Sequence, residues 1–88
     1  MQVSIDISLY PLAEHDFKHD IWQFIKKLRQ VEGLKVITNG MSTQVFGEYD
    51  LAVQTVMAEI KHTHQQLGCA VFVCKFITGD RSHLEVET

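Results

Sequence analysis

The chain has 88 residues, enough for one domain with a modest core and too few for two. Its 45% hydrophobic and 22% charged residues are typical of a globular protein, and its net charge of −3 argues against a nucleic-acid-binding one. No apolar run approaches the roughly 18 residues of a membrane span. The first residues show neither a basic n-region nor an apolar h-region, so we do not expect secretion. We therefore expect one cytoplasmic domain over residues 1–88, without nucleic-acid or membrane partners.

Residues 3–10 alternate between apolar and polar side chains, which predicts a half-buried strand. Pro11 lacks a backbone N–H donor and should end this strand. Residues 16–32 change to helical spacing, with apolar residues from Phe17 onward. Asp16 is the expected N-cap of this helix, and Gly33 the expected residue just after its end.

Asn39-Gly40 stands between two short alternating segments, residues 34–38 and 41–48. This pair predicts a two-residue hairpin turn in which both residues need positive φ. Such a turn pairs Thr38 with Met41. It places on one face Leu34, Val36, Thr38, Met41, Thr43 and Val45, and on the other Ile37, Ser42, Gln44, Phe46 and Glu48.

Asp50 should cap a second helix over residues 51–67, and Gly68 should end it. Residues 69–78 are too apolar for a strand with one wet face, so we expect both faces to be covered. Cys69 and Cys74 point to opposite faces of that strand and cannot form a disulfide with each other, which fits a reducing compartment. The polar tail, residues 80–88, adds a short edge strand or frays.

The predicted order is β-α-β-β-α-β. With right-handed crossovers, its compact solution is an α+β ferredoxin-like sandwich, in which both helices cover one face of an antiparallel sheet. The face without helices then carries Asp6, Ser8, Tyr10, Ile37, Ser42, Gln44 and Phe46, joined by Val71, Val73 and Ile77 if Lys75 points away from the helices. A mixture of hydroxyls with apolar and aromatic groups marks an interface, where two such faces stack or one face covers a ligand.

No motif for catalysis, metal binding or phosphate binding occurs in the chain. The histidines lack metal-ligand spacing, and Cys74 lacks a neighbouring signal for a lowered pKa. Gly40, Gly47 and Gly68 do not form a loop that cradles a phosphate before a helix. These observations favour a binding module without a cofactor over an enzyme.

Two stretches carry a family resemblance: Ser-Leu-Tyr-Pro-Leu at residues 8–12 and Met-Ser-Thr-Gln-Val-Phe-Gly-Glu-Tyr-Asp at residues 41–50. Together they resemble the YkoF-type thiamin/hydroxymethylpyrimidine-binding family of the thiamine-binding protein superfamily, over nearly the whole chain. The resemblance implies a ferredoxin-like domain that binds thiamin or its pyrimidine precursor without transforming it and that forms dimers or tetramers. Some relatives carry Glu where this chain has Phe46, so their pocket does not transfer unchanged.

An aminopyrimidine needs hydrogen-bonding groups at its edge and an apolar or aromatic wall along its face, while a thiazolium cation suits aromatic rings and carboxylates. These needs select as ligand-binding candidates Asp6, Ser8, Tyr10, Met41, Ser42, Thr43, Phe46 and Glu48. The predicted register divides them, because Met41 and Thr43 face the helices while others lie on the open face. The pocket therefore lies either on the open face or between the sheet and the helices.

The sequence and the resemblance together lead us to expect a carrier or buffer for thiamin or hydroxymethylpyrimidine in salvage. We expect a homodimer or homotetramer formed through the open sheet face. One alternative is an ACT-type regulatory module, which has the same fold and binds effectors between subunits. Another is a small dimeric ferredoxin-like enzyme, for which His64 is the candidate catalytic residue.

Overall fold

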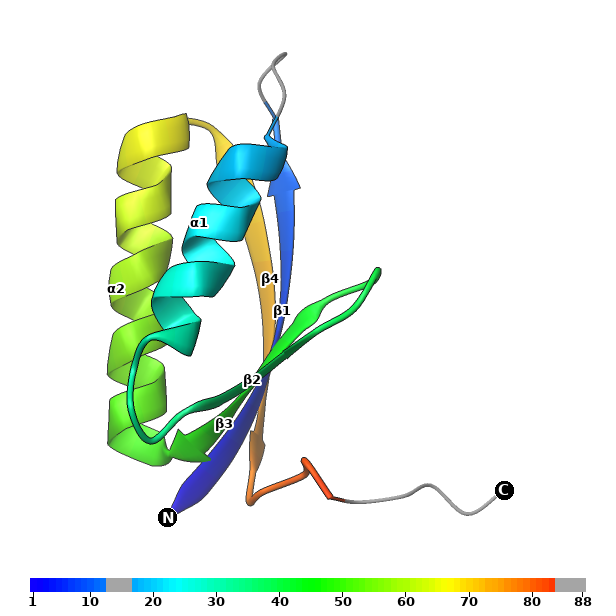
Figure 1. Ribbon diagram of the computed structural model, residues 1–88, viewed down its shortest axis with the longest axis vertical. Coiled ribbons are helices and arrows are strands. Elements are labelled where there is room, and N and C mark those ends of the chain that lie inside the picture. The colour runs from blue at the N-terminus through cyan, green and yellow to red at the C-terminus, as the bar shows by residue number, and fades with distance from the viewer. Residues whose placement is uncertain (13–16, 84–88) are drawn as a thin grey trace.

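The computed structural model describes residues 1–12 and 17–83. Their elements follow the predicted β-α-β-β-α-β order. They are β1 (Gln2–Pro11), α1 (Lys18–Arg29), β2 (Lys35–Thr38), β3 (Thr43–Glu48), α2 (Tyr49–Leu67) and β4 (Ala70–Thr78). The strands form one antiparallel sheet in the order β2-β3-β1-β4, and both helices lie on the same side of it (Figure 1). The ferredoxin-like α+β fold is therefore confirmed.

The core lies between the helices and the apolar face of the central strands. Along β1 the alternate side chains Val3, Ile5 and Ile7 are buried against the helices, as the alternation predicts, and Leu9 is half-buried. The buried cluster consists of Val3, Ile5, Ile7, Phe24, Ile25, Leu28, Val45, Ala52 and Val56. β1 extends one residue beyond residues 3–10 at each end, and Pro11 is its last residue, opposite Ala70.

Helix α1 ends earlier than predicted, at Arg29 instead of residue 32. After it the N–H of Val31 donates to Leu28 O and the N–H of Leu34 donates to Val31 O, so the chain tightens into turns. Gly33 has a φ of 94° in this connection, a conformation that favours glycine. The expected N-cap, Asp16, lies outside the described residues, as do the tail residues 84–88.

The prediction of a two-residue turn at Asn39-Gly40 is wrong. Thr38 pairs with Thr43 instead of Met41, so the register differs by two positions and the loop covers residues 39–42. The Asn39 side-chain carbonyl accepts the N–H groups of Met41 at 2.8 Å and Ser42 at 3.2 Å, and Gly40 does not have positive φ. Because the shift is even, Val36, Thr43 and Val45 keep their predicted face, whereas Met41 lies in the loop, 89% exposed.

Helix α2 begins at Tyr49, and its N-cap is Glu48 rather than Asp50. A Glu48 carboxylate oxygen accepts the N–H of Leu51 at 2.9 Å. Gly68 ends the helix with a φ of 76°, as predicted. Neither helix in the described part of the chain is both long and apolar enough to cross a lipid bilayer.

The expectation that both faces of β4 are covered is wrong for the single chain. β4 is an edge strand, and Val71, Val73 and Ile77 are exposed on the face away from the helices. Both cysteines are free, and Cys69 precedes the strand instead of lying in it. After β4 the chain turns across the sheet, on the side opposite the helices in Figure 1.

Gly47→Ala should lower the free energy of unfolding by about 1–3 kcal/mol, the usual cost of overpacking a core. A Cβ at this buried position would lie 2.6 Å from Leu34 Cδ2 and 3.1 Å from the backbone O of Gly33. Urea denaturation measures the change. Gly40→Ala is the control, because its Cβ would meet nothing within 4 Å; a larger loss at Gly40 than at Gly47 would contradict the observed hairpin.

Candidate functional site

A hollow of about 370 Å³ lies on the open face of the sheet. We call it the open-face hollow. It is lined by Ser4, Ile5, Asp6, Gln44, Phe46, Lys75, Ile77 and Arg81. The register of the central strands brings most of these side chains together: Ser4 lies opposite Phe46 and Ile77, and Asp6 lies opposite Gln44 and Lys75. Three strands therefore contribute to one surface.

The segment after β4 forms one wall of the open-face hollow, and Ser4 holds it there. The Ser4 hydroxyl donates to Gly79 O at 2.8 Å and accepts the N–H of Arg81 at 2.9 Å. The N–H of Gly79 also donates to Gln2 O at 2.8 Å. These bonds keep Arg81 beside the sheet, although it follows the last strand.

Asp6 is the carboxylate of the open-face hollow. The Ser42 hydroxyl donates to Asp6 Oδ1 at 2.7 Å, which ties the hairpin loop to the central strand. Desolvation, followed by the negative charge of Asp6, raises the pKa of the Cys74 thiol above its ordinary value. Cys74 thus remains a protonated thiol at neutral pH, without the thiolate that nucleophilic chemistry requires.

Phe46 is an aromatic lining residue of the open-face hollow, where the 7% of its surface that is exposed can contact a ligand. Ile77 adds a second apolar group, and Gln44 offers both amide donors and an acceptor. A planar heteroaromatic ring can therefore pack against Phe46 and Ile77 while Asp6 and Gln44 bind its edge.

The second hollow lies between the hairpin loop, β1 and α1, and measures about 140 Å³. Ligand pockets commonly have volumes of roughly 300–1,000 Å³, a range that includes the open-face hollow and excludes the second one. The second hollow is lined by Ile7, Ser8, Leu9, Ile21, Phe24, Ile25, Thr38, Asn39, Gly40, Met41, Ser42 and Thr43. We therefore take the open-face hollow as the candidate site.

The structure separates the eight residues that the sequence proposes as ligand contacts. Asp6 and Phe46 line the open-face hollow, and the second hollow is lined by Ser8, Met41, Ser42 and Thr43. The Thr43 hydroxyl lies 3.1 Å from that of Thr38. Tyr10 lies on the open face opposite Val71, 55% exposed, and lines neither hollow.

Glu48 also lines neither hollow, because its carboxylate caps α2. The backbone hydrogen bonds from Leu51 and then Asp50 lower the pKa of Glu48 below its ordinary value of 4.5. This position at a helix N-terminus favours the ionised carboxylate.

Sequence reasoning missed four polar residues of the open-face hollow: Ser4, Gln44, Lys75 and Arg81. Alternation along the strands places Ser4 on the same face as Asp6, and Gln44 on the same face as Phe46, so the signal for these two was present. The face to which Lys75 points depended on the register of β4, which the sequence left open. Arg81 carried no local signal, because tertiary hydrogen bonds to Ser4 position it.

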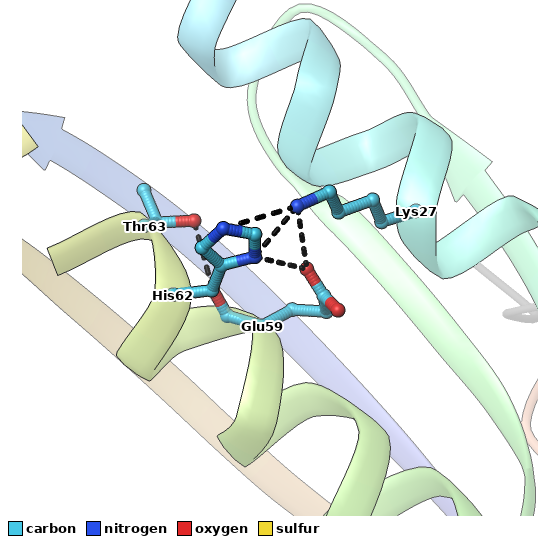
Figure 2. Close-up of polar contacts among 4 residues, drawn as sticks. All are labelled: Lys27, Glu59, His62 and Thr63. Atoms are coloured by element: carbon cyan, nitrogen blue, oxygen red, sulfur yellow. Dashed lines mark hydrogen bonds and ion pairs between the residues drawn. The ribbon is translucent and has the colours of Figure 1, made fainter. Parts of the chain in front are cut away.

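A polar cluster joins the two helices on the other side of the sheet (Figure 2). Lys27 of α1 donates to His62 Nδ1 of α2 at 2.6 Å, and Lys27 Nζ lies 4.0 Å from Glu59 Oε2. The Thr63 hydroxyl donates to the backbone O of Glu59 at 2.8 Å. Because Lys27 already donates a hydrogen bond to His62 Nδ1, this ring nitrogen does not offer a free metal ligand. The cluster instead ties α1 to α2.

Within residues 1–12 and 17–83, no group of three or more His, Cys, Asp or Glu side chains could hold a metal ion. The exposed His64 has its ring 5.1 Å from that of Phe72. Phe72 packs against the core beneath the helices, so His64 lies on the helix side of the sheet, away from the open-face hollow.

No family model matches the chain, and no curated protein matches it. Several solved structures do match the chain. A Streptococcus pneumoniae protein is 20% identical, with a TM-score of 0.82 over 96% of this chain and 93% of its own. A hypothetical protein from Methanocaldococcus jannascii is 21% identical, with a TM-score of 0.75 over 96% of this chain and 84% of its own.

A candidate thiamine biosynthesis/salvage protein from Thermotoga maritima is 22% identical to this chain. Its TM-score is 0.74, and the match covers 86% of this chain and 82% of that one. At these levels of identity, the likeness shows a shared fold.

Replacing Glu48 by Gln should reduce stability in a pH-dependent way. Since folding lowers the pKa of Glu48, the stabilisation by its charge is fully present above the unfolded pKa and is lost as pH falls through the folded pKa. The difference in unfolding free energy between the two proteins should therefore be largest above pH 4.5 and shrink below it. Urea denaturation across this range tests it, and a difference that stays constant with pH would contradict the capping role.

Proposed function

We propose that this chain is a non-catalytic binding protein for thiamin or its hydroxymethylpyrimidine moiety, and that the open-face hollow is the binding site. The observation that carries the proposal is the combination of an aromatic surface, a carboxylate and an amide in one hollow of about 370 Å³. The resemblance of residues 8–12 and 41–50 to thiamin-binding proteins supports the same ligand class. The fold shared with the Thermotoga maritima salvage candidate is consistent with it.

The chemistry of an aminopyrimidine matches the polar groups of the hollow. Its exocyclic amino group is a donor, which a carboxylate oxygen of Asp6 can accept. Its ring nitrogens are acceptors, to which the Gln44 amide N–H₂ can donate. The ring face would lie against Phe46, where an aromatic contact adds to the burial of apolar area.

In this proposal the protein acts as a cytoplasmic carrier or buffer that retains its ligand unchanged for salvage. Binding without reaction requires only complementary groups, and Asp6, Gln44 and Phe46 are the groups that this proposal assigns to the ligand. Two free cysteines are compatible with a reducing compartment.

Calorimetry with thiamin and with hydroxymethylpyrimidine tests the ligand. We expect heat of binding from at least one compound, and weaker binding in Asp6→Asn and Gln44→Leu, by about 1–3 kcal/mol for each polar partner removed. Asn at position 6 keeps an oxygen to accept the Ser42 hydroxyl, so the hairpin contact is retained.

Ser8→Ala is the matched control, because Ser8 lines only the second hollow. It should leave binding unchanged. A loss of binding in Ser8→Ala, but not in Gln44→Leu, would move the site to the second hollow. The absence of heat and of a thermal shift at millimolar concentrations of both compounds would refute the proposed ligand.

We also propose that two or more copies associate through the open face as a homodimer or homotetramer. Beyond the hollow, this face exposes Tyr10, Val71 and Val73, which lie together because Tyr10 pairs with Val71 and Ser8 with Val73. Stacking two copies would bring this apolar strip against its own equivalent and remove it from water. Such burial adds a larger fraction to the stability of a domain of this size than to that of a large domain, because its own core is small.

Val73→Glu should shift the protein toward the monomer in sedimentation velocity, because it would place a charge inside the stacked interface. Met57→Glu is the matched control: Met57 is 46% exposed, close to the 48% of Val73, but it lies on α2. A wild-type protein that is purely monomeric at micromolar concentration, or equal effects of the two substitutions, would contradict association through this face.

A further inference from the structure

The open-face hollow carries an excess of positive charge. Among the residues that the structure describes, Lys75 and Arg81 line it together with a single carboxylate, that of Asp6, so two cations face one anion. A site built only for thiamin, whose thiazolium ring is cationic, would not gain from a second cationic side chain.

The described neighbours do not cancel this charge. Within residues 1–12 and 17–83, neither Lys75 nor Arg81 has a carboxylate at ion-pair distance. The nearby Asp80 carboxylate accepts both the N–H of Ser82 at 2.9 Å and its hydroxyl at 2.6 Å. The charges of His83 and Lys35 add to the lowering of the pKa of Asp80.

Arg81 is also held in place. Its backbone N–H donates to Ser4 Oγ, and Ser4 is buried, with 5% of its surface exposed. The same hydroxyl donates to Gly79 O, so one buried side chain fixes both ends of the turn that carries Arg81 to the hollow. A cationic group on an anchored segment loses less conformational freedom when it binds an anion.

We infer that the ligand of the open-face hollow carries an anionic group, and that a phosphate monoester of the hydroxymethylpyrimidine fits better than thiamin. This inference rests on the proposed function. A phosphate monoester has a charge between about −1.5 and −2 at neutral pH and offers several acceptor oxygens. Arg81 can bind two of them in parallel, and Lys75 contributes a point charge, while Asp6 and Gln44 remain available for the pyrimidine.

Titration calorimetry with hydroxymethylpyrimidine and with its phosphate monoester tests the inference. The ester should bind about tenfold more tightly or better, and this preference should fall as salt is raised, because salt screens exposed charges. Lys75→Gln and Arg81→Gln should each reduce the preference, because each should weaken binding of the ester more than binding of the unphosphorylated pyrimidine.

Two substitutions on the helices are matched controls, because they remove the same charge from exposed positions outside the hollow. Lys61→Gln on α2 and Arg29→Gln on α1 should keep the full preference for the ester. Equal losses in the control and hollow variants would overturn the inference, since they would show an effect of net charge alone.

Ser4→Ala tests the positioning role of Ser4, because it keeps both cations and removes only the hydroxyl that anchors Arg81. The ratio of the two affinities should fall, whereas general destabilisation of the fold would weaken both ligands alike. Circular dichroism verifies that the variant is folded, and the salt dependence of the wild-type protein provides a readout that does not depend on this variant.

The outcomes separate the inference from the proposed function. Equal affinity for the pyrimidine and its ester, without salt dependence, would overturn the anion-binding inference and leave the proposed function intact. Another outcome is that inorganic phosphate binds to the wild-type protein but not to Lys75→Gln or Arg81→Gln, and that no pyrimidine binds. In that case the anion subsite stands and the proposed function fails. The absence of binding by the pyrimidine, the ester and inorganic phosphate would overturn both.

Discussion

The position of β1 between β3 and β4 is the constraint on which the rest of the structure depends. Ile5 lies opposite Val45 on one side and Phe76 on the other, so one register sets the alignment of three strands. Because side chains alternate with a period of two, this register buries Val3, Ile5 and Ile7 under the helices and turns Ser4 and Asp6 to the open face. A slip of one residue would exchange the two sets, and burying a carboxylate is far more costly than exposing an isoleucine.

The same register divides the open face into two regions with different chemistry. At one end, Asp6 and Lys75 lie side by side with Gln44 and Phe46, and the turn after β4 closes the wall. At the other end, β1 and β4 continue beyond β3 and present Tyr10, Val71 and Val73 to water. A hollow that combines charged and apolar groups suits a small ligand, and an apolar strip suits a protein partner, so the two proposals use separate parts of one surface.

The candidate site was accessible from the sequence only where strand alternation decides it. Asp6 and Phe46 were placed on the open face correctly. Asp6 follows from the alternation along β1, and Phe46 keeps its face because a shift of two positions in the hairpin leaves the faces unchanged. Met41 was grouped with the core-facing residues because Asn39-Gly40 suggested a two-residue turn. The Asn39 side chain instead accepts two backbone N–H groups, and this local competition lengthens the loop and leaves Met41 exposed. Glu48 was assigned to a ligand, but it is the N-cap of α2, where a carboxylate satisfies backbone N–H groups that have no helical partner.

By itself, the sequence determined the order of the elements, the layer in which each lies and the face to which the residues of β1, β2 and β3 point. These properties follow from hydrophobic periods of 2 and 3.6 residues, which are local features of the chain. Only the tertiary structure decided which residues of the open face share a hollow and that Arg81 reaches it. Contacts between strands distant in the chain, and the hydrogen bonds of Ser4 across 75 and 77 positions, set these neighbours, and no local pattern encodes the contacts that position them.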